Sequence, residues 1–197
     1  MPTGVALPDA RAQLFDAAER VMVRQGPSAL TSRAVTQEAG CAKGVLHRHF
    51  ADLDDFLVEL VLDRIARIET QAVHLRQAAG TATVLDNLTE ALRAVFGSVA
   101  LVIVGLVISR DALRARLRHY VPTGVPVLAE ATTMLASYLR AERDLGRIAA
   151  DADVDTLAPT LIGAGHLLFA DRDGAPPDAP SIRRVVSAVI AGVVPQD

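Results

Sequence analysis

The sequence predicts an all-α fold, and three observations support this prediction. Apolar residues recur three and four positions apart over most of the chain, which is the spacing of one face of an α-helix. Glycine and proline separate these stretches, as they do at helix ends. The β-branched run 99–108 could form a strand, but no other stretch offers it a partner. We therefore expect about nine helices, with an N-terminal three-helix domain over 1–52 and a C-terminal helical domain over 53–197.

Charge is unevenly distributed along the 197 residues, which carry a net charge of −3. Residues 1–50 hold six Lys and Arg against four Asp and Glu, a net charge of +2, so residues 51–197 carry −5. A basic end on an acidic body fits nucleic-acid binding by that end. The single cysteine, Cys41, excludes an intramolecular disulfide framework. Residues 1–10 lack the basic and apolar regions of a signal peptide, so we expect a cytoplasmic protein.

The first helix is predicted over residues 11–26. Asp9 is a plausible N-cap, because its carboxylate can accept a hydrogen bond from a free N–H of the first turn. Gly26 closes the helix and is followed by Pro27. The predicted core-facing stripe consists of Leu14, Ala17, Ala18, Val21 and Met22.

Two short helices with a tight turn are predicted next, over 31–50. Thr31 is a good N-cap, and Gly40 ends the first of the two, because glycine adopts the left-handed conformation without a side-chain clash. The second runs from about Lys43 to His49. Leu46 and Phe50, four residues apart, face inward. A short helix after a glycine-bearing turn, with cationic and imidazole groups outward, is typical of a helix-turn-helix that enters a DNA major groove.

The first 65 residues or so resemble the DNA-binding domain of the TetR family of bacterial repressors. That family carries a motif of the kind T-x-x-x-I-A-x-x-A-G-V-S-x-G-T-L-Y-x-H/Y-F. Matching or related residue types are found here at Thr31, Val35, Ala39, Gly40, Cys41, Ala42, Lys43, Gly44, Leu46, His49 and Phe50. The resemblance implies DNA contacts by Thr31, Ser32, Arg33, Ala42, Lys43, Gly44, Val45, His47, Arg48 and His49.

The sequence departs from the family pattern at several positions. Val45 replaces a Thr or Ser, His47 a Tyr that contacts phosphate, Leu53 a Lys that often touches the DNA backbone, and Thr36 an Ala in the packing of the two helices. Residues 1–10 contain no Lys or Arg, so a basic arm is missing. These departures support an alternative hypothesis: an all-helical ligand-binding or interaction module that has lost specific DNA binding.

The remaining helices are predicted from the same signals. Asp52 and Asp55 cap a helix that reaches about Arg76, a length of about 36 Å. The ten apolar residues 99–108 are too few for a membrane span, which needs about 20. They predict either a core helix or the lining of an apolar cavity, and the sequence does not separate the two. Further helices are expected over 83–96, 127–145, 154–169 and 181–193, and in a helical 110–119 segment Arg110, Arg114 and Arg118 would share one face.

The function predicted from these features is that of a dimeric, ligand-responsive transcriptional repressor that binds a palindromic operator. The family resemblance implies a homodimer through helices 154–169 and 181–193. A small hydrophobic effector is expected in the C-terminal domain, with candidate lining residues Phe96, Ile103, Met134, Tyr138 and His166. We expect no enzyme activity, cofactor or membrane association, because the sequence offers no nucleophile–base pair, no glycine-rich phosphate loop after a strand and no metal-ligand spacing.

Overall fold

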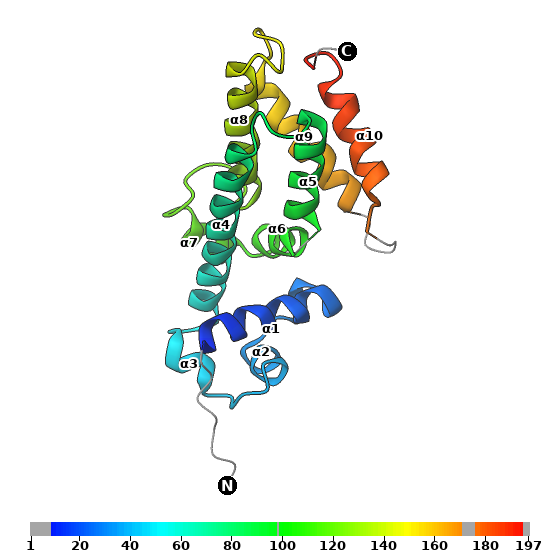
Figure 1. Ribbon diagram of the computed structural model, residues 1–197. Helices are drawn as coiled ribbons and strands as arrows, with labels where there is room; N and C mark the ends of the chain where they lie inside the picture. Colours follow the sequence, from blue (N-terminus) through cyan, green and yellow to red (C-terminus); the bar gives the residue numbers. More distant parts are fainter. Residues whose placement is uncertain (1–8, 98, 171–175, 195–197) are drawn as a thin grey trace. The chain divides into compact units, whose positions relative to one another are not determined.

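The computed structural model describes residues 9–97, 99–170 and 176–194. These residues form α-helices and one 3₁₀ turn, with no strand, which confirms the predicted all-α class (Figure 1). They contain ten α-helices rather than about nine, because Arg110 is extended (φ −125°, ψ 96°) and separates α6 from α7. The helices are α1 Ala10–Gln25, α2 Ser32–Glu38, α3 Val45–His49, α4 Leu53–Gln77, α5 Val84–Phe96, α6 Ala100–Ser109, α7 Asp111–Leu117, α8 Leu128–Asp144, α9 Val154–Phe169 and α10 Ala179–Ile190. The predicted loop 170–180 includes 171–175, which lie outside the described residues.

The chain divides into two compact units. Unit 1 comprises Met1–Asp63 and Val102–Val125, and unit 2 comprises Arg64–Leu101 and Pro126–Asp197. Helix α4 therefore contributes residues to both units. These two units are defined by packing. The predicted division after residue 52 instead separates a DNA-binding domain from a ligand-binding domain, and it stays a prediction.

Unit 1 is held together by the packing of α1 on α2 and α3. The Asp9 carboxylate accepts a hydrogen bond from the Ala12 N–H at 3.0 Å, as the sequence predicts for an N-cap. Phe15, Phe50 and Phe56 form an aromatic cluster with ring centroids 5.0–5.7 Å apart. The five predicted stripe residues of α1 are buried. Apolar burial and ring packing thus fix α3, through Phe50, against α1 and the start of α4.

The part of α6 that belongs to unit 1 is a buried core helix. Ile103 and Leu106 are fully buried there, and Leu113 of α7 is fully buried too. Asp52 caps α4 by accepting from the Asp55 N–H at 2.7 Å, and Asp55 accepts in return from the Ala51 N–H at 3.0 Å. Among the described residues no single helix is long and apolar enough to span a membrane; only α5 and α6 taken together, across a sharp bend, pass that test.

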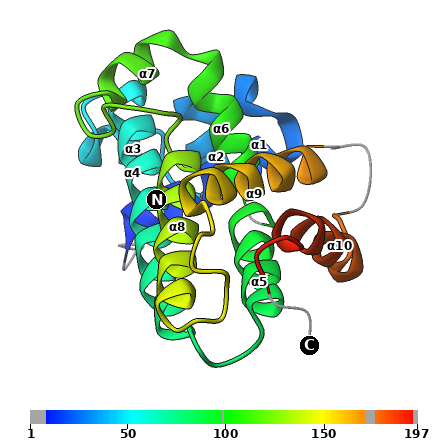
Figure 2. The same ribbon diagram turned by 90° about the horizontal axis from the view of Figure 1, so that it is seen from above.

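Unit 2 contains α5, α8, α9 and α10, with α9 and α10 packed on each other and both packed on α5 (Figure 2). Gly165 permits the close approach of α9 to α5: a Cβ atom at this position would lie 2.7 Å from Cε2 of Phe96. The Phe96 ring also packs against His166 and Phe169, at centroid distances of 6.2 and 5.7 Å. The α5–α9 contact therefore requires a residue without a side chain at position 165.

A buried polar network joins four segments of unit 2. Glu142 of α8 is fully buried; it accepts from the Gly80 N–H at 3.3 Å and pairs with Arg147 at 3.3 Å. The Tyr138 hydroxyl accepts from the Asn87 side chain at 3.0 Å. Burial, with the Glu142 carboxylate as a further cause, raises the pKa of Tyr138 strongly, so this hydroxyl stays protonated.

Candidate nucleic-acid interface and pocket

The turn between α2 and α3 follows the local rules that the sequence predicts. The Thr31 hydroxyl accepts from the Ala34 N–H at 3.1 Å and begins α2. Gly40 has φ +65°, in the left-handed region that favours glycine. Helix α3 begins at Val45, two residues later than the predicted Lys43, because Lys43 and Gly44 form a turn in which the Val45 N–H bonds the Ala42 carbonyl at 2.9 Å.

One side of α3 is packed and the other is open. Leu46 is fully buried and Phe50 is 3% exposed, as the sequence predicts. Thr36 is buried in α2, where its hydroxyl donates to the Ser32 and Arg33 carbonyls at 2.9 and 3.2 Å. A threonine can therefore replace the usual alanine without leaving a polar atom unsatisfied. Of the predicted DNA-contacting residues, Ser32 and Val45 are half-buried, and the exposed ones are Thr31, Arg33, Ala42, Lys43, Gly44, His47, Arg48 and His49.

The cations of this region fall into two groups. Arg33, Lys43 and Arg48 are exposed, and none of their side chains forms an ion pair or hydrogen bond with another described residue. We call these three residues the open cations. Each arginine of α1 has a carboxylate partner: Arg20 and Arg24 pair with Glu38, and Arg11 pairs with Glu59 at 3.0 Å. Hydrogen bonds from Arg20 and Arg24 hold the pKa of Glu38 below its ordinary value. In this region, positive charge without a partner is thus concentrated at α2, α3 and the turn between them.

The aromatic cluster also orients the end of α3. The Arg11 guanidinium lies 4.6 Å from the centroid of the Phe50 ring and donates to the His49 carbonyl at 3.4 Å. The His49 side chain remains exposed. Burial raises the pKa of Cys41, so its thiol is held in the neutral form, as expected of a small packed side chain. In the described part of the chain, no three metal-binding side chains come together.

The predicted effector-lining residues do not form one group. Phe96 and His166 lie against each other in unit 2, where Met134 and the hydrogen-bonded Tyr138 are also buried. Ile103 belongs to unit 1. Their role in ligand binding stays a prediction.

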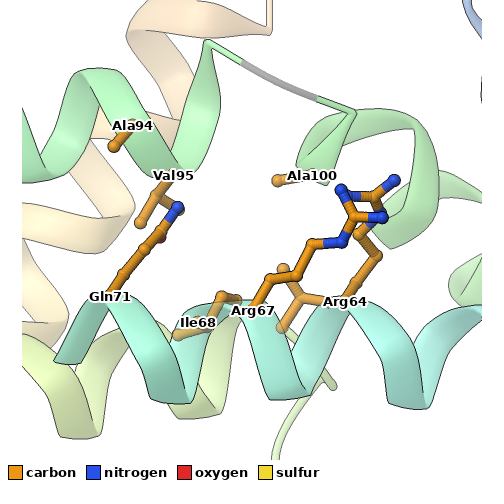
Figure 3. A pocket seen from close by; sticks show the side chains of 8 residues that line it. Arg64, Arg67, Ile68, Gln71, Ala94, Val95 and Ala100 are labelled. Atoms are coloured by element: carbon orange, nitrogen blue, oxygen red, sulfur yellow. The ribbon is translucent and has the colours of Figure 1, made fainter. Parts of the chain in front are cut away.

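A pocket of about 190 Å³ lies elsewhere in unit 2 (Figure 3). It is lined by none of those five residues. Its lining consists of Arg64, Arg67, Ile68, Gln71, Ala94, Val95, Ala100 and Val127. The three polar members were not among the predicted site residues, although helical spacing indicates them: Arg64, Arg67 and Gln71 recur at i, i+3 and i+7 and so share one face of α4.

Together, the all-helical fold and the α2–α3 geometry define a helix-turn-helix protein. Residues 14–60 match the family described as "Bacterial regulatory proteins, tetR family". The chain is also 29% identical over 94 residues to the uncharacterized HTH-type transcriptional regulator YfiR of Bacillus subtilis, an alignment that spans 46% of each protein, about half the length of that relative. Residues 14–60 are therefore similar to the DNA-binding domain of TetR-family transcriptional regulators.

Solved structures extend the likeness of fold to nearly the whole chain. A TetR-family transcriptional regulator from Agrobacterium tumefaciens superposes with a TM-score of 0.71 at 14% identity, over 95% of this chain and 98% of that one. The fatty acid degradation regulator FadR from Bacillus halodurans gives 0.68 at 16% identity, over 92% and 98%. A Saccharomonospora viridis protein, a candidate transcriptional regulator solved in complex with choline, gives 0.69 at 17% identity, over 96% and 100%. At these identities the likeness establishes the fold.

Proposed function

We propose that this chain is a dimeric, ligand-responsive transcriptional repressor that binds a palindromic operator through α2 and α3. The observation that carries the proposal is the set of open cations, Arg33, Lys43 and Arg48, on the exposed side of a helix-turn-helix. Cations without a carboxylate partner can neutralise DNA phosphates without first breaking an ion pair. The charge distribution therefore favours DNA as the ligand of this surface.

The contacts divide into phosphate and base contacts. Thr31, Ser32 and Arg33 lie at the start of α2, whose free N–H groups suit a phosphate. The base contacts fall to α3, where Arg48 can bond guanine and Val45 can contact a thymine methyl group. Further contacts are proposed for Ala42, Lys43, Gly44, His47 and His49, which surround these two residues in the sequence.

A second copy of the chain is the proposed partner of α9 and α10. Thr156, Thr160, Gly163 and Leu167 recur at intervals of four, three and four along α9, and all are exposed and uncharged. Leu167 is 76% exposed, and a Cβ atom at Gly163 would meet no other atom within 4 Å. An uncharged stripe with small residues at this spacing suits helix pairing about a twofold axis. A twofold dimer presents two helix-turn-helix segments, which bind two inverted half-sites, and this explains the expected palindrome.

Ligand response is proposed to act through α4, because this helix contributes residues to both units. A small hydrophobic effector, as the sequence predicts, would bind in unit 2 and alter the position of the first half of α4. The similar Saccharomonospora viridis protein was solved in complex with choline, which supports a small-molecule ligand for this chain. The coupling must be reciprocal: an effector that weakens DNA binding is itself bound less tightly in the presence of DNA.

The test is selection of DNA from a library of genomic fragments, followed by measurement of oligomeric state. We expect an enriched fragment with two inverted half-sites, and a dimer by sedimentation. Leu167→Glu should give monomers that bind a single half-site weakly, because it places charge in the proposed interface. Leu145→Glu, at another exposed leucine, is the matched control and should leave the dimer intact. Absence of any enriched fragment would instead favour the alternative, a helical ligand-binding module without specific DNA binding.

A further inference from the structure

We propose that the pocket of unit 2 binds a small neutral molecule with an amide group, such as a lactam or a primary amide, through the side-chain amide of Gln71. The residues around the pocket then set the chemical class of the effector, so this inference deepens the proposed ligand response and rests on it. An amide ligand carries an N–H donor beside a carbonyl acceptor, the same two groups that a glutamine side chain presents.

The side-chain amide of Gln71 has no hydrogen-bond partner among the described residues. Its Oε1 atom is buried, and the amide forms no hydrogen bond with another described side chain or backbone group. A buried acceptor that has lost its hydrogen bonds with water is unfavourable, and a ligand N–H that reaches it would satisfy it. The Nε2 group of the same amide can donate in turn to the ligand carbonyl. These two hydrogen bonds favour a ligand that carries both groups.

The Gln71 side chain lies on the pocket side of α4. Figure 3 shows it directed across the pocket toward Val95 of α5. The backbone of Gln71 lies within the helix, before its last turn, so the amide is carried by a rigid element. A ligand that enters the pocket therefore meets this amide in a fixed position, which lowers the entropic cost of forming the two hydrogen bonds.

The other polar groups of the pocket wall have partners of their own. Arg64 and Arg67 each take part in interactions elsewhere, and the Val127 N–H donates to Glu130 Oε2 at 2.6 Å. The remaining lining side chains are aliphatic: Ile68, Ala94, Val95 and Ala100. Recognition of a polar ligand group therefore depends on Gln71. This residue is uncharged and cannot compensate the burial of an ionised group, so a neutral ligand is favoured.

The pocket is small. Its volume of about 190 Å³ is below the roughly 300–1,000 Å³ that hold drug-sized ligands. Val127, in the wall, has φ +76°, a conformation that β-branched residues rarely adopt and that clusters at ligand sites. The site thus suits a single apolar ring with one amide group, and not a long acyl chain.

Titration of the full-length protein without DNA, followed by NMR chemical shifts, tests this inference. The probes are δ-valerolactam and benzamide, each compared with its fully N-methylated form, which keeps the carbonyl and lacks the N–H. We expect at least one of the two amides to bind about tenfold or more tightly than its methylated form, because only the N–H can satisfy the buried Oε1 atom of Gln71. Gln71→Leu should remove that preference.

Gln77→Leu is the matched control, because Gln77 is an exposed glutamine of the same helix that does not line the pocket. It should keep the preference of the wild type. The inference is overturned if neither amide is preferred to its methylated form, or if Gln71→Leu keeps the preference, since the methyl group would then be excluded by size alone. Tighter binding of benzoate than of benzamide would also overturn it.

Operator release by the same probes is measured separately, by fluorescence anisotropy. Release by the methylated forms as readily as by the amides would support the proposed repressor and contradict the amide site. Binding of an amide through Gln71 without operator release would support the site and contradict the proposed ligand response. The two failures are therefore distinguishable.

Discussion

Glu38 in unit 1 and Glu142 in unit 2 are both paired with arginine, yet they are used in opposite ways. Glu38 lies near the surface, 20% exposed, and its partners Arg20 and Arg24 are each more than half exposed. Glu142 is fully buried, and its partner Arg147 is 30% exposed. The first pair is surrounded by water, whereas the second joins an interior network.

The difference in burial shows that a glutamate–arginine ion pair has two roles in this protein. An exposed ion pair adds little stability, but it neutralises the arginines of α1 and leaves the open cations of α2 and α3 as the unpaired positive charge in that region. A buried pair must keep its partner, because the remaining charge has no water to solvate it. Changes to the buried pair should therefore affect folding, whereas changes to the open cations should affect DNA binding.

The largest effect is expected for Arg147→Ala. Removal of one partner from a buried ion pair costs about 3–5 kcal/mol. We expect about 3 kcal/mol, at the low end of that range, because Glu142 keeps its bond with the Gly80 N–H. Urea unfolding measures the change. Arg140→Ala is the control, since Arg140 pairs with an exposed Asp155, and its effect should be below about 1 kcal/mol. Equal losses of unfolding free energy in Arg147→Ala and Arg140→Ala would show that the buried Glu142 does not depend on its partner more than the exposed Asp155 does.

A smaller effect is expected for Arg48→Ala, on operator binding. If Arg48 bonds a guanine, its removal should weaken specific binding by about 1–3 kcal/mol and relax the preference for that base. Arg24→Ala, which removes an exposed arginine already paired with Glu38, should leave the affinity unchanged. Fluorescence anisotropy with the selected operator measures both. Unchanged affinity in Arg48→Ala and Lys43→Ala would mean that α3 is not the element that reads the DNA.

The smallest effect is expected for Glu38→Gln, and it depends on pH. Because the arginines lower the pKa of Glu38 in the folded protein, its stabilising contribution is present above the ordinary value of 4.5. That contribution is lost as the pH falls through the lower folded pKa. The wild type should therefore be slightly more stable than the variant near pH 7, and the two should converge below about pH 4. A stability difference between wild type and Glu38→Gln that grows as the pH falls would contradict the pairing of Glu38 with Arg20 and Arg24.

The sequence predicted the elements whose signals are local. Asp9, Thr31 and Asp52 cap their helices as expected, because a capping bond spans three residues. The start of α3 was misplaced by two residues, since Lys43 and Gly44 can continue a helix or form a turn, and only packing decides. The bond between the Tyr138 hydroxyl and Asn87, fifty-one residues away in the sequence, has no local signal and depends on the tertiary fold.

The pocket could not be predicted as a whole, for the same reason. Its lining comes from α4, α5, the first residue of α6 and Val127, four segments that only the tertiary fold brings together. The positive φ of Val127 has no sequence signal, because a valine gives no indication of it. The polar face of α4 was the one part of the site that helical spacing alone could have indicated.

The salt dependence of operator binding tests the central claim most directly, namely that the open cations contact phosphate and the paired arginines of α1 do not. The slope of log K against log salt concentration decreases in magnitude by about 0.9 for each phosphate that the protein no longer neutralises. We predict that Lys43→Ala reduces the magnitude of the slope by about one and that Arg24→Ala leaves it unchanged. Equal reductions in the two variants, or none in Lys43→Ala, would contradict the claim.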